Sequence, residues 1–359
     1  MRMMLYQRYL MRETLAAVLL VLAAFIALFS FFDLINEVRN VGKGGYLFGH
    51  ALVFVLLSLP GRVYELIPIA ALIGTLYALS TLARHSEITV LRASGLSTRE
   101  LLMTLFKLAA LLALATLVIG EGVVPFSERA AQDLRARAMN NVVAQGFESG
   151  LWIKDGRKFV NVRTAMPDAR LMGIRIYEFD EANALKSVSE AKEGSFLPSG
   201  RWKLQEVVST ILQGDSARVE RHETLEWQSA LNPDLLSVLM VAPERMSLYG
   251  LVKYTRHLID NRQKTERYEI AIWKKLIYPL ATLVMVALAL PFGYTHSRMG
   301  AVSLKIFAGV MIGILFHMLN GLFSSLGVIN SWPPFASAAA PSALFMLAAM
   351  GMLWWVERR

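Results

Sequence analysis

The stretch Lys158–Arg163, KFVNVR, alternates apolar and polar side chains from Val160 onward and is the first of several short segments of this kind. Gly173–Phe179 (GIRIYEF), Trp202–Val208 (WKLQEVV) and Ala217–Trp227 follow it, and turn-forming sequences separate them. Such alternation places successive side chains on opposite faces of a β-strand. Several short strands at this spacing predict an antiparallel β domain of the sandwich or jelly-roll type.

Long apolar segments flank this β-rich region, three before it and three after it. Each is about long enough to cross the ~30 Å hydrocarbon core of a bilayer as a helix. The chain has 359 residues, of which 55% are hydrophobic, and it contains no cysteine. These features favour an integral membrane protein whose folded insert has no disulfide. The predicted spans are Leu15–Phe32, Leu66–Ala83, Leu101–Ile119, Leu276–Phe292, Gly300–Val328 and Phe335–Val356.

We therefore predict an α-helical membrane protein with six transmembrane helices, three on each side of an inserted antiparallel β jelly-roll domain. Residues 1–125 hold the first three helices, together with a short cytoplasmic helix at about 84–96. Residues 126–266 form the β domain with helical connectors at its two ends, and residues 267–359 hold the last three helices.

Arginines predict the orientation of these helices. They precede the first span, lie between the second and third and between the fourth and fifth, and follow the sixth. Positively charged loops stay in the cytoplasm, so both termini are expected there and the insert outside. Lys274 and Lys275, at the outer end of the fourth span, are exceptions to this pattern. The arginines are Arg2, Arg8, Arg12, Arg84, Arg92, Arg99, Arg298, Arg358 and Arg359.

No pattern in the chain predicts catalysis. The sequence lacks the nucleotide-binding pattern G-x-x-x-x-G-K-[ST], the zinc pattern H-E-x-x-H and the nucleophile pattern G-x-S-x-G. No aromatic and basic cluster indicates nucleic-acid binding. His317, alone in the fifth span, is interpreted as a hydrogen-bonded packing residue rather than a ligand. We expect a non-catalytic protein with no metal site and no cofactor of its own.

The stretch Arg84–Glu100, RHSEITVLRASGLSTRE, carries the sharpest local signals. Ser86 can cap a short helix, and Gly95 can end it in the left-handed conformation. Ser97 and Glu100 then form a capping box that opens the third span. The sequence thus predicts a short helix on the cytoplasmic face.

This short helix is expected to expose Glu87 and Arg92 and to offer Ile88 and Leu91 as an apolar edge. An ordinary capped loop and a docking element for a cytoplasmic partner are both compatible with the spacing.

A second polar cluster, Asp33, Glu37, Arg39 and Lys43, lies where the first span leaves the membrane on the outer side. A solvated turn and a site for an anionic ligand both fit this composition. The first and fifth spans also carry large apolar side chains. The spacing of these residues fits both a static contact between helices and a gate that moves.

Taken together, these segments resemble the LptF/LptG permease family, the paired membrane subunits of the lipopolysaccharide exporter. The resemblance is carried by Arg8–Leu15 (RYLMRETL), Ser86–Ser97 (SEITVLRASGLS), Leu151–Val160 (LWIKDGRKFV) and the last three spans. It covers essentially the whole chain, and LWIKDGRKFV is more similar to the LptG side of the family.

The resemblance implies a half-transporter in the bacterial inner membrane with a periplasmic jelly roll. Such a permease takes lipopolysaccharide from the outer leaflet and passes it through the jelly roll towards the outer membrane. The implied partners are a second, LptF-like permease subunit, a dimeric LptB-like cytoplasmic ABC ATPase that uses the ATP, and an LptC/LptA-like periplasmic bridge protein. An LptF-like sister subunit and, from another class, a membrane sensor with a periplasmic ligand-binding domain are the alternatives.

The resemblance also assigns residues to these contacts. The cytoplasmic helix is expected to dock on the ATPase through Glu87, with Arg92, Ile88 and Leu91 beside it. The first span and the partner's fifth span form a lateral gate in the family. The candidates for acyl-chain contact there are Phe25, Phe29, Ile312, Phe316, Leu319 and Phe323.

Arg39 and Lys43 are the candidates for contact with the lipid phosphates. LptG-type members carry a lysine near the position of Asp33, and an aspartate cannot pair with phosphate. Arg39 or Lys43 would therefore have to replace that anchor.

Overall fold

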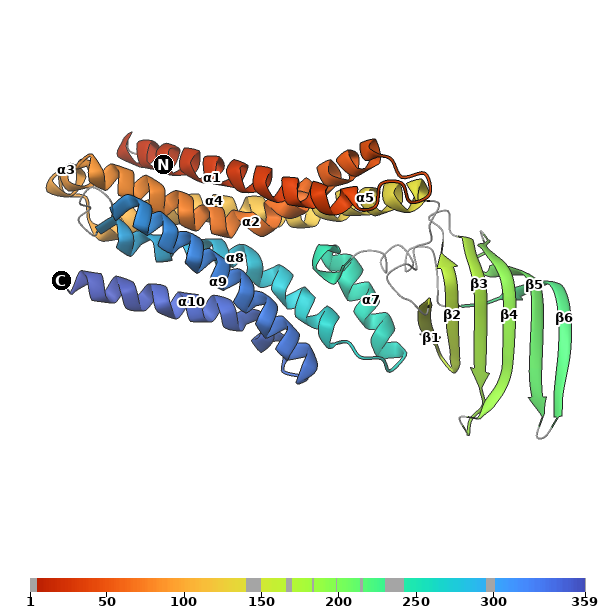
Figure 1. The fold of residues 1–359 in the computed structure, drawn as a ribbon. Helices are drawn as coiled ribbons and strands as arrows, with labels where there is room; N and C mark the ends of the chain where they lie inside the picture. The colour runs from red at the N-terminus through yellow and green to blue at the C-terminus, as the bar shows by residue number, and fades with distance from the viewer. Residues whose placement is uncertain are drawn as a thin grey trace.

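The chain folds into an elongated bundle of helices with a β domain at one end (Figure 1). The computed structural model describes residues 5–139, 150–165, 170–182, 184–197, 199–213, 216–229, 242–294 and 301–358. Arg2, Arg298 and Arg359, three of the arginines that predict the orientation, lie outside these residues.

Six apolar helices in the described part are long enough to cross a membrane, which confirms the predicted number. The third span is composite: α4 continues through a π-helical turn, η1, into α5. The helices are α1 (Leu5–Val38), α2 (Phe48–Arg84), α4 (Thr98–Val118) with η1 (Ile119–Val123) and α5 (Val124–Ala138), α8 (Glu266–Tyr294), α9 (Ala301–Ile329) and α10 (Pro334–Glu357).

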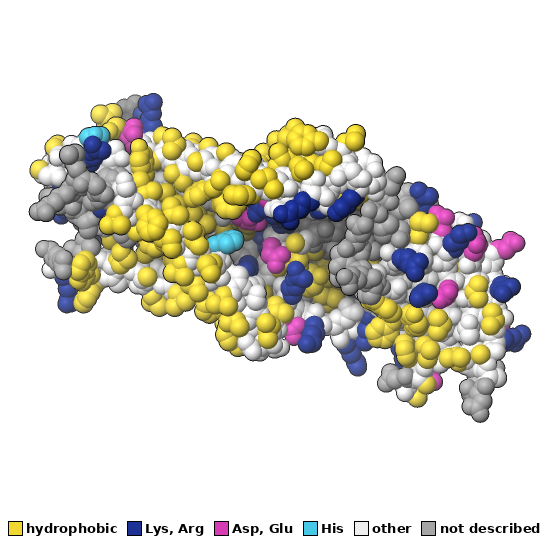
Figure 2. All heavy atoms as spheres, in the orientation of Figure 1, with side chains coloured by type: hydrophobic (Ala, Val, Ile, Leu, Met, Phe, Trp, Pro, Cys, Tyr) yellow, Lys and Arg dark blue, Asp and Glu magenta, His cyan; other side chains and the backbone are white. Residues whose placement is uncertain are grey.

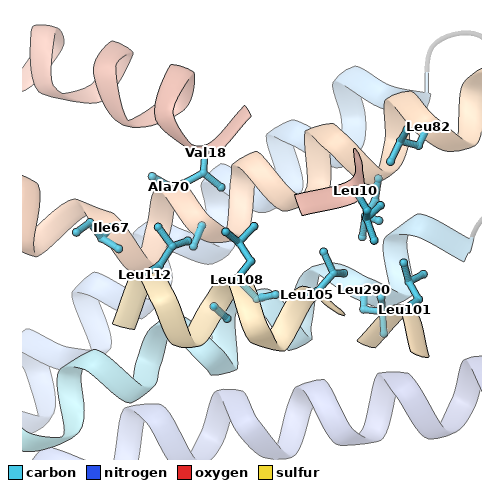
Figure 3. Packing of buried hydrophobic residues seen from close by; sticks show 14 of the residues in the cluster. Leu10, Val18, Ile67, Ala70, Leu82, Leu101, Leu105, Leu108, Leu112 and Leu290 are labelled. Carbon is cyan, nitrogen blue, oxygen red and sulfur yellow. The ribbon is translucent and has the colours of Figure 1, made fainter. Parts of the chain in front are cut away.

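Helix α2 is the centre of the bundle. In its most apolar stretch 78% of the residues are buried, compared with 11% in α1 and 22% in α9. It contacts α1, α8 and α9. The largest core cluster joins α1, α2, α4 and α8, and Figure 3 shows Val18 beside Ala70 and the leucines of α4 facing the same core. Helices α1 and α9 therefore leave most of their apolar surface uncovered.

Close packing of α1 on α2 depends on a residue without a side chain. A Cβ atom at Gly74 would lie 2.5 Å from the Val18 Cα and 2.6 Å from its backbone nitrogen. Small residues at such points let helix backbones approach closely in a membrane. Gly74 thus sets the distance between the first two spans.

Within the described part of the insert, six strands form an antiparallel sheet and pair in chain order. An inserted antiparallel β domain is confirmed, and its described strands form a meander that does not close into a barrel. The strands are β1 (Leu151–Asp155), β2 (Lys158–Ala165), β3 (Arg170–Phe179), β4 (Leu185–Phe196), β5 (Trp202–Gln213) and β6 (Ser216–Trp227).

A crease crosses this sheet where two strands adopt left-handed backbone angles. Gly173 in β3 has φ of 62° and Glu206 in β5 has φ of 51°. Beyond the crease the alternation shifts by one residue, so that Leu171 and Ile174 are both buried. At the crease the Lys192 side chain donates a 2.8 Å hydrogen bond to Glu206, and both side chains are exposed. The crease bends the sheet around its core.

The buried side of the sheet is joined to the bundle by α7 (Leu248–Asp260). Trp202 is fully buried in the sheet core, and Tyr254 of α7 packs against that core. Leu251, one turn earlier, packs with Ala271 of α8. The Ser247 hydroxyl caps α7 by accepting the Gly250 N–H at 3.1 Å. Helix α7 thus contacts the sheet and the fourth span together.

We predict that Gly74→Ala lowers the thermal unfolding temperature of the detergent-purified chain, because the added methyl group would push α1 away from α2. The expected cost is about 1–3 kcal/mol, as for other overpacked contacts. Gly49→Ala is the matched control, since a Cβ at Gly49 meets no atom within 4 Å. An equal unfolding temperature for Gly74→Ala and wild type would contradict the close-packing role.

Candidate functional site

The local signals predicted between the second and third spans are largely present. Helix α3 (Glu87–Ala93) lies at the same end of the bundle as both termini (Figure 1). Gly95 ends it with φ of 98°. The Ser97 hydroxyl accepts the Glu100 N–H at 3.2 Å, and the Glu100 carboxylate accepts the Ser97 N–H at 3.0 Å, which confirms the capping box.

The predicted cap at Ser86 is wrong. Ser86 has a φ of 60° and its side chain makes no capping hydrogen bond. Helix α2 ends at Arg84, so only a short turn leads into α3, and that turn requires the left-handed conformation at Ser86. An N-cap requires an extended backbone instead.

The apolar edge expected on α3 is also partly wrong. Ile88 is only 6% exposed and packs into the bundle core with Leu82 and Leu101. The short helix lies on the ends of the bundle, so its apolar side faces inward and anchors it. Val90, by contrast, is 61% exposed, and the half-buried Glu87 accepts a 2.8 Å hydrogen bond from the Tyr9 hydroxyl. Arg92 is exposed and Leu91 is half-buried.

Near the C-terminal end of α1, Asp33 is bound by an arginine of α2. The Arg62 guanidinium donates to both Asp33 carboxylate oxygens, at 2.7 and 2.6 Å, and also to Glu65 at 3.0 Å. Such a two-point contact fixes both side chains. Asp33 therefore neutralises a neighbouring cation, a partner that the sequence alone does not indicate.

Glu37, in the same cluster, is buried and accepts hydrogen bonds from within the chain. The Tyr46 hydroxyl donates to it at 2.8 Å, and the Arg135 guanidinium lies 3.3 Å away. Burial and the hydrogen bond to this carboxylate raise the pKa of Tyr46. Arg39 and Lys43 remain exposed, and Lys43 donates to the Asn40 side-chain oxygen at 3.0 Å. The two acidic residues are structural, whereas the two basic ones face outward.

A cavity of about 180 Å³ opens between α2, α8 and α9, towards the end of the bundle that carries the β domain. Figure 2 shows basic and acidic side chains gathered around a hollow between the bundle and the β domain. His317 is exposed on the cavity wall rather than packed, because α9 is a peripheral helix. The polar lining comprises Tyr64, Glu65, Glu244, Arg245, Lys274, Lys275, Tyr278, His317 and Asn320.

Two cations of this lining are held by carboxylates. Arg245, in the short η3 turn (Pro243–Arg245) before α7, lies 2.9 Å from Glu128 and 3.5 Å from Glu65. Lys275, only 5% exposed in its side chain, lies 2.9 Å from Glu121. Lys274 is half-buried in the same wall, and no carboxylate of the described residues lies within ion-pair distance of it.

Glu121 also connects the span to the β domain. It lies in the π-helical turn η1, and its carboxylate accepts the Leu248 N–H at the start of α7 at 2.8 Å. Lys275 in turn donates to the Met246 carbonyl. π-Helical turns are uncommon in proteins, and those that occur often lie at functional sites. This ion pair therefore ties the third span, the fourth span and α7 together.

Sequence reasoning missed Arg62, Arg245 and Glu121 as parts of a site. The sequence signal that could have indicated this site was the pair Lys274 and Lys275, because charged residues within a span are costly and often mark functional positions. Arg245 follows a stretch without periodic pattern, so only the fold brings it to the cavity.

The gate candidates on α9 face inward. Phe316 is 1% exposed and packs edge-on against Phe345 of α10, with ring centroids 5.1 Å apart. Ile312 and Leu319 are half-buried against the same cluster, and Phe323 contacts Trp332. Phe316 is therefore buried within this single chain, and its contact with a lipid chain stays a prediction. The exposed side of α9 carries Leu304, Phe307, Met311, Ile314, Leu315, Met318 and Leu322.

The candidates on α1 do face outward. Phe29 is exposed, and the half-buried Phe25 lies 6.3 Å from it between ring centroids. The Arg62 guanidinium lies 6.0 Å from the Phe29 ring. The exposed side of α1 thus ends at the charged cluster around Asp33, and its role in a gate stays a prediction.

Comparison with known proteins extends these observations. The family described as "Lipopolysaccharide export system permease LptF/LptG" matches residues 8–355. The permease protein LptG of Haemophilus influenzae is 31% identical over 353 residues, which are 98% of each chain. LptG of Escherichia coli strain K12 is 32% identical over 96% of this chain and 97% of its own. LptF of that strain is 30% identical over 40% of each chain.

We predict that Lys275→Met destabilises the purified chain by roughly 3 kcal/mol, because it leaves the Glu121 carboxylate without its partner in a poorly hydrated place. The measurement is thermal unfolding in detergent. Adding Glu121→Gln to this variant should recover part of the loss, which a double-mutant cycle quantifies. Lys264→Met, at an exposed turn, is the control and should change nothing.

Proposed function

Because this chain belongs to the LptF/LptG family of lipopolysaccharide export system permeases, we propose that it is one permease half of an ATP-driven exporter. The exporter takes lipopolysaccharide from the outer leaflet of the bacterial inner membrane and passes it to the β domain. The observation that supports this most is the outer cavity, which places Lys274 and His317 beside the apolar wall of the spans.

Lipid extraction needs both an anion site and an apolar path. Each methylene group moved from lipid into water costs about 0.8 kcal/mol, so several acyl chains cannot cross open water. The uncovered apolar sides of α1 and α9 supply a lipid-contacting surface. ATP hydrolysis must supply the work, and we assign it to a separate cytoplasmic ATPase because the sequence carries no P-loop.

Lys274 is the cation best suited to bind a lipid phosphate. Arg62 and Arg245 are already engaged by carboxylates, whereas Lys274 has none within ion-pair distance among the described residues. Arg39 and Lys43, exposed at the outer end of α1, remain the proposed contacts further out. A lysine in a cavity wall is only partly hydrated, which strengthens its attraction for a dianion.

A second permease subunit fits the uncovered helices. Both α1 and α9 pack on α2, and in each most of the apolar surface faces away from the chain. Two such chains would enclose a cavity larger than the one in a single chain. The lateral gate then lies between α1 of one subunit and α9 of its partner, and on α9 the outward residues such as Phe307 and Met311 replace Phe316.

We propose that the ATPase partner docks on α3. The described arginines Arg8, Arg84, Arg92 and Arg358 belong to the end of the bundle that holds the termini, which supports a cytoplasmic location for that end. The periplasmic β domain would then meet the bridge protein. Ile88 is the residue of α3 that packs into the bundle core, so it would transmit a movement of α3 to that core.

The likeness to the LptG proteins extends over 96–98% of the chain, and the likeness to LptF over 40%. We therefore propose the LptG-like position in the exporter. No feature of the described residues favours a sensor.

Mass spectrometry of the tagged chain purified in mild detergent tests the proposal. We expect an ABC-type ATPase, a second six-helix subunit and lipopolysaccharide in the same preparation. Recovery of a folded chain with neither protein nor lipopolysaccharide would overturn the exporter assignment.

We predict that Lys274→Met lowers the lipopolysaccharide recovered per chain at least fivefold, because the phosphate loses its cation. Lys264→Met, exposed in the turn before α8, is the matched control and should retain wild-type recovery. Undiminished lipid in the Lys274 variant would remove this residue from the headgroup site.

We predict that Glu87→Ala abolishes ATP-dependent transport in the reconstituted complex, because the docking contact on α3 loses its carboxylate. Thermal unfolding of the isolated chain should be nearly unchanged. Tyr9→Phe separates docking from internal packing, since it removes the 2.8 Å hydrogen bond to Glu87 but keeps the carboxylate. Transport lost equally in Tyr9→Phe would assign Glu87 a structural role instead.

A further inference from the structure

One row of side chains on the side of the β sheet opposite the core is mainly apolar, since four of its five members are aromatic or aliphatic. Its members are paired directly across five strands, from β2 to β6, and we call them the apolar row. They are Phe159, Tyr177, Val188, Thr210 and Val219.

The apolar row is accessible along its length. Val219 is 57% exposed at its far end, and Phe159 is 39% exposed at the near end. Trp152, also exposed, stacks on Tyr177 with ring centroids 5.7 Å apart. Figure 2 shows hydrophobic side chains on one face of the β domain. An apolar band of this kind on a sheet that faces solvent marks a binding surface.

The neighbouring row on the same face is different. It consists mainly of polar and charged side chains, and Arg175 and Glu190 within it form a 2.9 Å ion pair. The apolar row is therefore a distinct stripe and not a general property of the face. The neighbouring row is Asn161, Arg175, Glu190, Val208 and Arg221.

A second cavity, of about 540 Å³, lies at the near end of the apolar row. Phe159 belongs to both, and its ring lies edge-on to Phe179 at 5.6 Å. We call this cavity the hairpin pocket, because the turn between β1 and β2 forms part of its wall. Its lining is Lys154, Gly156, Arg157, Phe159, Phe179, Asp260, Asn261 and Arg262.

The hairpin pocket carries a net positive charge. It has three cations and one acid, and neither Lys154 nor Arg262 has a carboxylate within ion-pair distance among the described residues. Arg157 is 3.1 Å from Glu181, but both side chains are more than half exposed, so this pair is weak and replaceable. Lys154 lies over the Phe159 ring at 5.7 Å. The pocket is therefore suited to an anion next to an apolar group.

The position of the hairpin pocket indicates which anions lie near it. The Gly156 N–H donates to the Asn261 side-chain oxygen at 3.0 Å, which joins the β1–β2 turn to the end of α7. Arg262 lies in the turn between α7 and α8, and α8, which begins at Glu266, is long and apolar enough to cross a membrane. Headgroup phosphates of the adjoining leaflet are the nearest abundant anions to such a place.

We propose that the hairpin pocket and the apolar row together bind an anionic amphiphile. A headgroup phosphate contacts Lys154 and Arg262 in the pocket, and an acyl chain lies along the row towards Val219. The site lies outside the buried core of the sheet and apart from the bundle cavity. The proposal rests on the proposed function in one respect, because that function brings lipopolysaccharide to this surface. Phosphatidylglycerol also combines a phosphate headgroup with acyl chains.

A photo-crosslinking experiment on the full chain in detergent tests this. Benzoylphenylalanine replaces Val219, and the probes are lipid A, phosphatidylglycerol and, as the zwitterionic comparison, phosphatidylcholine. We expect a crosslink to lipid A whose yield falls at least fivefold in Lys154→Gln/Arg262→Asn. Asparagine is chosen because Arg262 has φ of 51°, a conformation that asparagine tolerates.

Matched controls separate binding from folding. Thr224, exposed on the same strand but outside the row, should give little crosslink when replaced. Lys154→Arg/Arg262→Lys keeps the charges and should keep the yield. A crosslink to phosphatidylglycerol as strong as that to lipid A supports a general anionic-lipid site. Preference for lipid A assigns the site to the exported lipid.

Three results would overturn the inference. They are equal yields from positions 219 and 224, a yield unaffected by loss of the two cations, and crosslinking to a copurifying protein in place of lipid. Lipopolysaccharide recovery with the wild-type chain is measured in parallel. A chain that carries lipopolysaccharide but gives no crosslink at Val219 rejects this site alone, and the exporter assignment stands.

Discussion

The ion pair between Lys275 and Glu121 decides how the two parts of this protein are joined. A lysine in a span is costly unless a partner satisfies its charge, and the π-helical turn in the third span presents that partner. The same two side chains also bind the backbone at Met246 and Leu248, just before and within the first turn of α7. The place where the chain leaves the membrane and the place where it returns are therefore held together.

The two candidate lipid sites follow from this joint. Helix α7 packs against α8 through Leu251 and against the sheet core through Tyr254. The bundle cavity lies on the α8 side of the joint, with Arg245 and Lys275 in its wall, and the hairpin pocket lies where the end of α7 meets the β1–β2 turn. Both sites combine cations with apolar or aromatic walls, which is the chemistry that an amphiphile with a phosphate headgroup requires.

The α9 candidates illustrate a limit of reasoning from hydrophobic pattern. In a transmembrane helix the side facing lipid and the side facing other helices are both apolar, so periodicity does not separate them. On α9, Phe316 contacts Phe345 inside the bundle, whereas Phe307 faces outward, although both positions carry the same type of side chain. On α3 the same ambiguity placed Ile88 at the surface, although it anchors the helix to the core.

The sequence by itself determined the six spans, the position of the β insert, the capping box at Ser97 and the family, because these depend on local periodicity, length and residue order. Only the tertiary structure decided which charges meet. Asp33 and Arg62 are brought together by the packing of α1 on α2, and Arg245 reaches Glu128 across a whole domain of intervening sequence. It also decided the crease at Gly173 and Glu206, where strict alternation fails. Long-range contacts leave no fixed spacing in a sequence, because the folded backbone and not the residue interval sets the distance between them.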